Sequence, residues 1–239
     1  MLAGVRKAGE APDGTEEVLL DVTDAKQIAE AASRVDRLDG LVNNAGIAIA
    51  MPLELVPLEE LRRQLEVNLI GQVAVTQAFL PALRAARGRV VFVGSIAGKS
   101  ALPFLGCYAA SKHALEAVAD SLRVELQPWG VGVSIVEPGT IRTAIWARGA
   151  ATADELASRE SRVEELYGRR IAAMRRVAAK RGASGAPPEA VAKVIEAALT
   201  DERPRTRSLV GRDARIRATI ERLPGRARDR VYVRLLLRD

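Results

Sequence analysis

Short apolar runs alternate along the first two thirds of the chain with longer segments whose apolar residues recur at helical spacing. The runs are continuous rather than alternating with polar residues, which is typical of strands buried on both faces of a parallel sheet. Strands that alternate with helices form βαβ units. We therefore predict an α/β fold with a doubly wound, Rossmann-like parallel sheet in three α/β/α layers. The predicted strands are residues 18–20, 38–42, 90–93, 131–136 and 208–210.

Helices are predicted between these strands. Thr23 or Asp24 can cap the first, and Gln27 follows Asp24 at capping-box spacing. Further helices are expected over 58–85 and 108–125, and another from Pro187 or Pro188 to about 199. Residues 143–181 are charged and mostly helical, 182–188 form a turn-rich break, and the arginine-rich remainder is weakly helical. With no repeat and no clear second domain, we expect a single domain over 1–239, with 140–182 as a lid over the substrate.

Composition narrows the class of protein. The 239 residues are 48% hydrophobic, which suffices for a full core and argues against disorder. We find no apolar run long enough to cross a bilayer and no signal-peptide pattern. The single cysteine, Cys107, cannot form an internal disulfide, which fits a reducing cytoplasm. We therefore expect a cytoplasmic protein with no membrane partner.

The formal net charge of +6 raises the question of a nucleic-acid partner. Aromatic residues make up only 3% of the chain, and acidic residues are interspersed with the arginines except toward the C-terminus. This pattern favours a solvated, arginine-rich surface over nucleic-acid binding. A structural or nucleic-acid-associated protein stays as an alternative, and it would show salt-sensitive DNA binding.

Three residues carry the candidate chemistry. Ser95 follows the predicted strand 90–93, where open parallel sheets bind ligands. Tyr108 and Lys112 are four residues apart at the start of a predicted helix, so they share one face. A free phenol titrates near pH ~10, and the Lys112 ammonium would favour the phenolate and make Tyr108 a general base for alcohol oxidation. A lone tyrosine–lysine pair on a helix is otherwise a common surface feature; Ser95 at this offset makes it specific.

With these residues the chain resembles the short-chain dehydrogenase/reductase family, most strongly over 21–143. The resemblance implies that Ser95 orients the substrate oxygen, Tyr108 is the general acid/base, and Lys112 lowers the pKa of Tyr108 and binds the nicotinamide ribose. It also implies a fourth catalytic residue, Asn68 in LEVNLIGQ, whose backbone carbonyl supports a proton relay. An ordinary polar residue in mid-helix is the simpler interpretation of Asn68.

The resemblance further implies a set of coenzyme-binding residues. Asn43, Asn44, Ala45 and Gly46 would run beside the adenosine half, and Asp21 would contact the adenine, although Asp21 could also be a helix cap. The nicotinamide carboxamide would lie against a second set. That set consists of Pro138, Gly139, Ile141 and Thr143, beside Tyr108 and Lys112; a Pro-Gly pair is otherwise only a turn.

The choice of coenzyme depends on the end of the preceding strand. An acidic residue there favours NAD, and a basic one accommodates the phosphate of NADP. The segment at residues 3–7 has no acidic residue and contains Arg6, which can pair with a phosphate. We therefore expect NADP(H), with NAD as the alternative and with no metal.

The resemblance also places apolar residues along the substrate pocket. These are Leu102, Pro103, Phe104, Leu105, Ile145 and Trp146. With Ser95 and Tyr108, Phe104 and Trp146 are the expected substrate contacts. The expected substrate is an apolar secondary alcohol or ketone, lipid-, steroid- or retinoid-like, whose identity and reaction direction stay open. The resemblance implies a homodimer or homotetramer formed through helices 58–85 and 108–125.

The chain departs from the family pattern at its beginning. The family opens with a strand, a glycine-rich turn that cradles the pyrophosphate, and a helix, roughly thirty residues in all. None of these precedes Leu2, and the strand concerned would be central in the sheet. A misassigned start codon and a real truncation are the two explanations, and we favour the first. For this chain alone we expect weak dinucleotide binding, which keeps open a non-catalytic, regulatory function.

Two neighbouring residues have simpler interpretations. His113 points away from the face that Tyr108 and Lys112 share, so we expect it to pack or face solvent rather than transfer protons. Cys107 is expected to be a small wall residue of the site rather than a reactive thiol.

Overall fold

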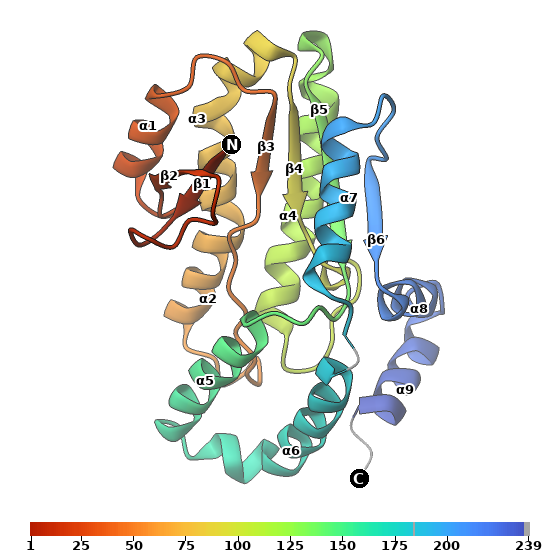
Figure 1. Cartoon of the computed structure of the whole chain (residues 1–239). Coiled ribbons are helices and arrows are strands. Elements are labelled where there is room, and N and C mark those ends of the chain that lie inside the picture. Colours follow the sequence, from red (N-terminus) through yellow and green to blue (C-terminus); the bar gives the residue numbers. More distant parts are fainter. Residues whose placement is uncertain (184, 237–239) are drawn as a thin grey trace.

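The computed structural model describes residues 1–183 and 185–236 (Figure 1). All paired strands run parallel. The strands are β1 Leu2–Val5, β2 Glu16–Leu19, β3 Gly40–Asn43, β4 Arg89–Val93, β5 Gly132–Pro138 and β6 Arg207–Val210. The α-helices are α1 Ala25–Ser33, α2 Leu58–Leu65, α3 Gly71–Ala86, α4 Gly106–Glu125, α5 Ile145–Ser158, α6 Arg162–Ala183, α7 Pro188–Thr200, α8 Arg212–Ile220 and α9 Gly225–Leu236. Short turns are η1 Glu66–Ile70 (π), η2 Ile96–Gly98 and η3 Gln127–Trp129.

This architecture confirms the predicted α/β class and most of the predicted elements. Asp24 caps α1 by accepting from the backbone N–H groups of Lys26 and Gln27, as the capping-box spacing predicts. Strand β5 continues through Pro138, two residues further than predicted. The C-terminal segment, expected to be weakly helical, forms the helices α8 and α9.

The parallel sheet is divided into two parts. Strands β1 and β2 pair with each other, and β3, β4, β5 and β6 form a separate four-stranded sheet in that order. No described strand lies between β1 and β3, which is where the sequence predicts a gap. Apolar side chains near this division are solvent-accessible, since Leu19 on β2 is 51% exposed and Val42 on β3 is 37% exposed.

The four-stranded sheet is covered on both faces (Figure 1). On one face Val90 and Phe92 of β4 pack with α3 and α4 in the larger core cluster. On the other face Val91 packs with Ala198 of α7. This alternation follows the two-residue period of a strand. The sheet thus delivers the ends of β4 and β5 to one edge, with α4 fixed above them.

The predicted helix 58–85 is realised as α2, η1 and α3 in one continuous run. By length and composition Leu58–Ala86 could cross a membrane, which corrects the expectation that no segment could. This is weak evidence for a membrane span, because core helices pass the same test. Here Val75, Phe79 and Leu83 of the helix are buried against the rest of the molecule.

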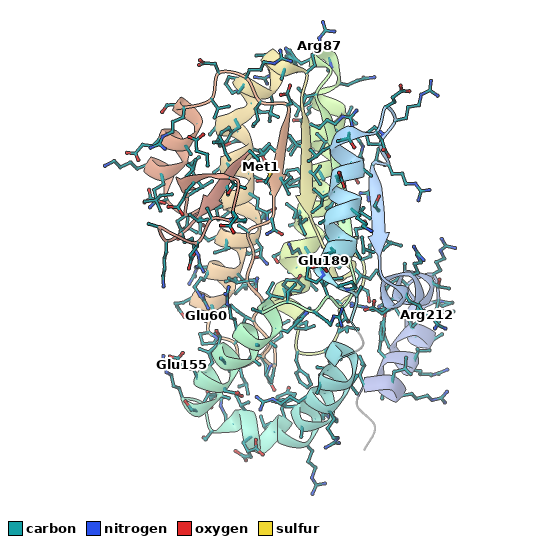
Figure 2. All side chains as sticks on the ribbon, in the orientation of Figure 1. Met1, Glu60, Arg87, Glu155, Glu189 and Arg212 are labelled. Atoms are coloured by element: carbon teal, nitrogen blue, oxygen red, sulfur yellow. The ribbon has the colours of Figure 1, made fainter. Side chains whose placement is uncertain are left out.

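Charged side chains are spread over separate parts of the surface. Figure 2 shows Glu60 and Glu155 near one end of the molecule and Arg87 at the other, with Arg212 on α8. Many arginines pair locally with acidic residues, as Arg63 does with Glu60. The absence of a nucleic-acid partner stays a prediction.

The core predicts a clear contrast along α4. Leu115 is fully buried between the sheet and α3, whereas Val124 on the same helix is 71% exposed. Leu115→Ala should lower the free energy of unfolding by about 2–5 kcal/mol, because it leaves a cavity in a packed core. Val124→Ala is the control and should change it by less than about 0.5 kcal/mol. Urea denaturation measures both, and equal effects would contradict this description of the core.

Candidate active site

Ser95 and Tyr108 meet at the carboxyl edge of the four-stranded sheet. Ser95 follows β4, is 6% exposed and caps the short helix η2 by accepting from Ala97 N at 3.1 Å. Its hydroxyl also lies 3.5 Å from the carbonyl oxygen of Pro138 at the end of β5. Tyr108 is on the first turn of α4 and hydrogen-bonds with Ser95. The structure therefore brings together two residues that are thirteen positions apart in the sequence.

The phenol of Tyr108 is buried at 5% exposure. Its ring packs edge-on against Trp146 at the start of α5, with 5.8 Å between ring centroids. Burial raises the pKa of the Tyr108 phenol, while the hydrogen bond with Ser95 and the positive charge of Arg217 act to lower it. The sequence predicts that Lys112 lowers this pKa. In the structure burial has the largest effect on the pKa of Tyr108, and the groups that act to lower this pKa are Ser95 and Arg217 rather than Lys112.

Lys112 occupies the next turn of α4 and is 4% exposed. Its ammonium donates a hydrogen bond to the carbonyl oxygen of Val93 at 2.8 Å and lies 5.9 Å from the centroid of the Tyr108 ring. Burial lowers the pKa of Lys112 to about 8, and the negative charge of Glu116 acts to raise it. Near neutral pH the residue is therefore mostly charged but close to the loss of its proton.

Asn68 is fully buried in the π turn η1. Its side chain accepts from Ile47 N at 2.8 Å and donates to Ile47 O and to the hydroxyl of Ser111 at 3.0 Å. Ser111 in turn donates to the carbonyl oxygen of Tyr108 at 2.7 Å. Asn68 thus connects the loop after β3 to the helix that carries Tyr108. An ordinary polar residue in mid-helix would not make these contacts.

Two buried glutamines on the same helical run were missed by the sequence analysis. Gln64 accepts from Ile49 N at 2.9 Å and donates to Ile47 O at 2.6 Å. Gln72 donates to Ala45 O at 2.6 Å. Their spacing of four from Asn68 on each side is the signal that could have revealed a polar stripe. Together the three amides hold residues 45–49 in place.

The residues expected near the adenosine lie around β2 and β3. Asn43 is buried and donates to Thr76 at 2.8 Å, whereas Asn44 is exposed at the surface and Gly46 lies beside Asn68. Asp21 follows β2 and accepts from the backbone and hydroxyl of Thr23, which lowers the pKa of its carboxyl group. Arg6, exposed after β1, contributes a further lowering by its charge.

The segment expected near the nicotinamide is fixed by a residue from the C-terminal region. Asp213 of α8 accepts from the backbone N–H and the hydroxyl of Thr140 at 2.7 and 2.8 Å. Its carboxylate leaves no room for a side chain at Gly139. Ile141 forms a bridge to Ala186, and Thr143 is exposed. Nothing in the arginine-rich C-terminal sequence distinguishes Asp213 beforehand.

An apolar cavity of about 240 Å³ opens beside Ser95. Phe104 and Trp146 line it as predicted, together with Leu102, Pro103 and Leu105. Ile145 and Tyr108, which were also expected at the substrate, instead pack in one small cluster and are not among the lining residues. Phe104 has a φ of +64°, rare for a bulky residue, and its carbonyl oxygen accepts from Met51 N at 2.8 Å. Helices α5 and α6 supply much of the remaining wall.

A second polar network closes the cavity from the C-terminal side. Arg217 of α8 lines the cavity and donates to the hydroxyl and the carbonyl oxygen of Ser100 at 3.2 and 2.7 Å. The Ser100 hydroxyl lies 2.7 Å from that of Tyr232, which donates to Glu221 at 2.6 Å. None of these four residues is predicted as functional from the sequence.

His113 lies as expected, whereas Cys107, expected in the wall of the site, is not among the residues that line the cavity. His113 is exposed and its Nδ1 lies 2.8 Å from Ala109 O. Cys107 is buried in an apolar cluster, and burial raises the pKa of its thiol. A raised pKa disfavours the reactive thiolate.

The contact between Asp213 and Thr140 can be tested directly. Asp213→Ala removes the acceptor of two hydrogen bonds and should lower the free energy of unfolding by about 1–3 kcal/mol. Hydrogen exchange at Thr140 N should accelerate with it. Asp229→Ala, which removes an exposed partner of Arg228, is the control and should leave that exchange rate unchanged. Unaltered protection of Thr140 in the Asp213 variant would contradict the assignment.

Comparison with known proteins identifies the family. The family model described as short chain dehydrogenase matches residues 5–154. An NADPH-dependent 3-dehydrocapnine reductase from Ornithobacterium rhinotracheale is 33% identical over 233 residues, covering 92% of this chain and 80% of the relative. Human retinol dehydrogenase 16 is 39% identical over 220 residues, covering 87% and 69%.

A solved structure extends the agreement to three dimensions. The short chain dehydrogenase from Burkholderia cenocepacia in complex with NADP superimposes with a TM-score of 0.73 at 28% identity, covering 98% of this chain and 85% of that one. With the matched family model and the parallel sheet flanked by helices, this shows that the chain belongs to the short-chain dehydrogenase family.

Proposed function

We propose that this protein is an NADP(H)-dependent oxidoreductase that interconverts an apolar secondary alcohol and the corresponding ketone. The observation that carries the proposal is the buried cluster of Ser95, Tyr108 and Lys112 at the carboxyl ends of β4 and β5, next to an apolar cavity. The reductase and dehydrogenase names of the relatives support the reaction class.

The described residues fit NADP(H) at its two ends. Arg6 places a guanidinium after β1 where the phosphate of the adenosine ribose would lie, and Asp21 offers a carboxylate close by. At the other end the buried Lys112 offers an ammonium toward the nicotinamide ribose. We therefore assign the coenzyme contacts of the described residues to these two ends.

Each of the three residues has a role that its surroundings support. When bound, NADP(H) accepts or supplies the hydride. Ser95 holds the substrate oxygen by a hydrogen bond, since Ser95 lines the cavity. Tyr108 takes the alcohol proton in oxidation and returns it in reduction. Lys112 is mostly charged near neutral pH, and its ammonium lies 5.9 Å from the centroid of the Tyr108 ring. In the proposed reaction this charge favours the phenolate, whereas in the structure burial dominates the pKa of Tyr108.

The proposed substrate follows from the wall of the cavity. Apolar side chains from the loop 102–105 and from α5 and α6 surround the opening beside Ser95. Such a wall favours a hydrophobic alcohol or ketone over a sugar. Residues 140–182 would act as the lid of a single domain over 1–239, because α5 and α6 form one side of this cavity. Tyr167 of α6 packs edge-on against Phe104 at 5.9 Å.

We also propose a cytoplasmic homodimer or homotetramer formed through the long helices. Leu58 and Ile70 are 59% and 50% exposed on one helical run, and Val124 and Trp129 are 71% and 49% exposed at the end of α4 and beyond. Exposed large apolar side chains on these helices favour a protein contact there.

The coenzyme proposal predicts weak but selective binding. We expect the 239-residue chain to bind NADPH less tightly than micromolar, and to prefer it to NADH because of Arg6. Arg6→Ala should weaken NADPH binding about tenfold and leave NADH binding unchanged. Fluorescence titration of the nicotinamide measures both, and Lys26→Ala on α1 is the control. Equal loss for both coenzymes would contradict the assignment of Arg6.

The catalytic proposal predicts the effect of one hydroxyl group. Tyr108→Phe should reduce the rate of ketone reduction at saturating NADPH by about 10²–10⁴-fold, because the proton donor is lost. Coenzyme binding should be retained, since the ring and its contact with Trp146 remain. NADPH absorbance with a panel of apolar ketones provides the measurement. An unchanged rate with intact binding would favour a non-catalytic, dinucleotide-binding protein instead.

A further inference from the structure

Two carboxyl groups are buried together on the far side of η2 from the substrate cavity. Glu137, near the end of β5, is fully buried, and Glu116 on α4 is 8% exposed. Two buried carboxylates repel each other, so at least one of them is disfavoured in its charged form. Neither residue has a part in the reaction proposed above.

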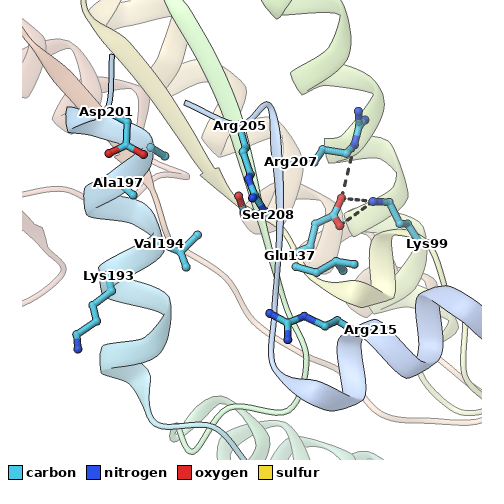
Figure 3. A pocket seen from close by; sticks show the side chains of 12 residues that line it. Lys99, Glu137, Lys193, Val194, Ala197, Asp201, Arg205, Arg207, Ser208 and Arg215 are labelled. Carbon is cyan, nitrogen blue, oxygen red and sulfur yellow. Dashed lines mark hydrogen bonds and ion pairs between the residues drawn. The ribbon is translucent and has the colours of Figure 1, made fainter. Parts of the chain in front are cut away.

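Two cations hold these groups in place (Figure 3). The Lys99 ammonium contacts both carboxylate oxygens of Glu137, at 2.5 and 2.7 Å. Arg207 of β6 donates from Nε to Glu116 Oε2 at 3.0 Å and lies 3.5 Å from Glu137 Oε1. The other end of the Arg207 guanidinium pairs with Asp120 of α4, which also pairs with Arg123. Lys99 therefore neutralises Glu137, while Glu116 shares Arg207 with two other acids.

One oxygen of this group lacks a partner. Glu116 Oε1 is buried and has no hydrogen bond among the described residues. It lies against η2, since a Cβ built at Gly98 would be 3.1 Å from it. A buried carboxylate oxygen without a donor is costly, whereas a protonated oxygen can itself donate to a neighbouring carboxylate. Arg207 Nε also lies within 3.5 Å of both carboxyl groups, so the two are neighbours, and this geometry favours a proton on Glu116.

Glu116 also acts on the proposed active site. It follows Lys112 by one helical turn on α4, and its negative charge favours the charged form of Lys112. Glu137, Lys99 and Arg207 line an open cavity of about 550 Å³, so the pair can exchange its proton with solvent. The buried carboxyl pair thus lies between this open cavity and the buried ammonium beside Tyr108.

We propose that Glu116 shares a proton with Glu137 at neutral pH, and that Glu116 is a positioning residue that controls the charge of Lys112. The second half of this inference rests on the proposed function. Burial and the charge of Glu137 raise the pKa of Glu116 to about 7. As the pH rises through this value Glu116 becomes negative and helps Lys112 keep its proton. The pair thereby extends the pH range in which Lys112 is charged.

Infrared difference spectroscopy tests the shared proton without any turnover. The difference between spectra at pH 6 and pH 8.5 should contain the carbonyl band of a protonated carboxyl group. Glu116→Gln should abolish this band, whereas Glu125→Gln, which alters an exposed residue of the same helix, should retain it. Glu137→Gln should shift the titration of the band to lower pH. A wild-type spectrum without the band, or a band unchanged in the Glu116 variant, would overturn the proposal.

The effect on Lys112 is tested by the pH profile of kcat/KM for ketone reduction. In Glu116→Gln the alkaline limb should move to lower pH by about one unit, because Lys112 loses its negative neighbour. Glu125→Gln should leave the limb in place. An unmoved limb in Glu116→Gln would overturn the coupling to Lys112. Absence of turnover in every variant, with the infrared band intact, would instead count against the proposed function alone.

Discussion

The hydrogen bond from the buried Lys112 ammonium to the carbonyl oxygen of Val93 is the interaction on which the site depends. It ties helix α4 to the end of strand β4, and so fixes Tyr108 relative to Ser95. A buried ammonium is costly, and burial lowers the pKa of Lys112 accordingly. The hydrogen bond to the Val93 carbonyl oxygen offsets part of this cost and leaves the ammonium 5.9 Å from the centroid of the Tyr108 ring. Lys112 therefore both holds α4 against β4 and supplies the positive charge of the proposed active site.

Around this centre the chain fixes irregular backbone by buried amides rather than by further strands. Gln64, Asn68 and Gln72 recur every fourth residue along one helical run and satisfy the backbone of residues 45–49. Gln64 and Asn68 each both donate to and accept from this loop, whereas Gln72 only donates, and its Oε1 has no partner among the described residues. The π turn at Glu66–Ile70 belongs to the same run, and it contains Asn68. The same run is connected to Tyr108, because Asn68 donates to the hydroxyl of Ser111, which donates to the carbonyl oxygen of Tyr108.

The sequence predicts local elements and the nearby residues of the site, because strand and helix periods and the Ser95–Tyr108–Lys112 spacing are local signals. It does not predict which distant residues complete the site. Asp213 and Arg217 lie on α8, some seventy residues or more from Thr140 and Ser100, and only the tertiary fold brings these partners together. Nor does spacing reveal how deeply Tyr108 is buried. That burial, rather than a neighbouring charge, dominates the pKa of its phenol.

The basic C-terminal region gains a different meaning once the fold is known. Arg207 pairs with Glu116 and Asp120, and Arg217 donates to the carbonyl oxygen and the hydroxyl of Ser100. Arg207 thus pairs with the buried Glu116 and the half-exposed Asp120, and Arg217 supports the cavity wall, so part of the positive charge that suggests a polyanionic partner acts inside the molecule. An arginine side chain can donate to several acceptors at once. Arg207 thereby joins β6 to α4, and Arg217 joins α8 to Ser100, just after η2. The arginine-rich sequence is thus partly a means of attaching the last helices to the site.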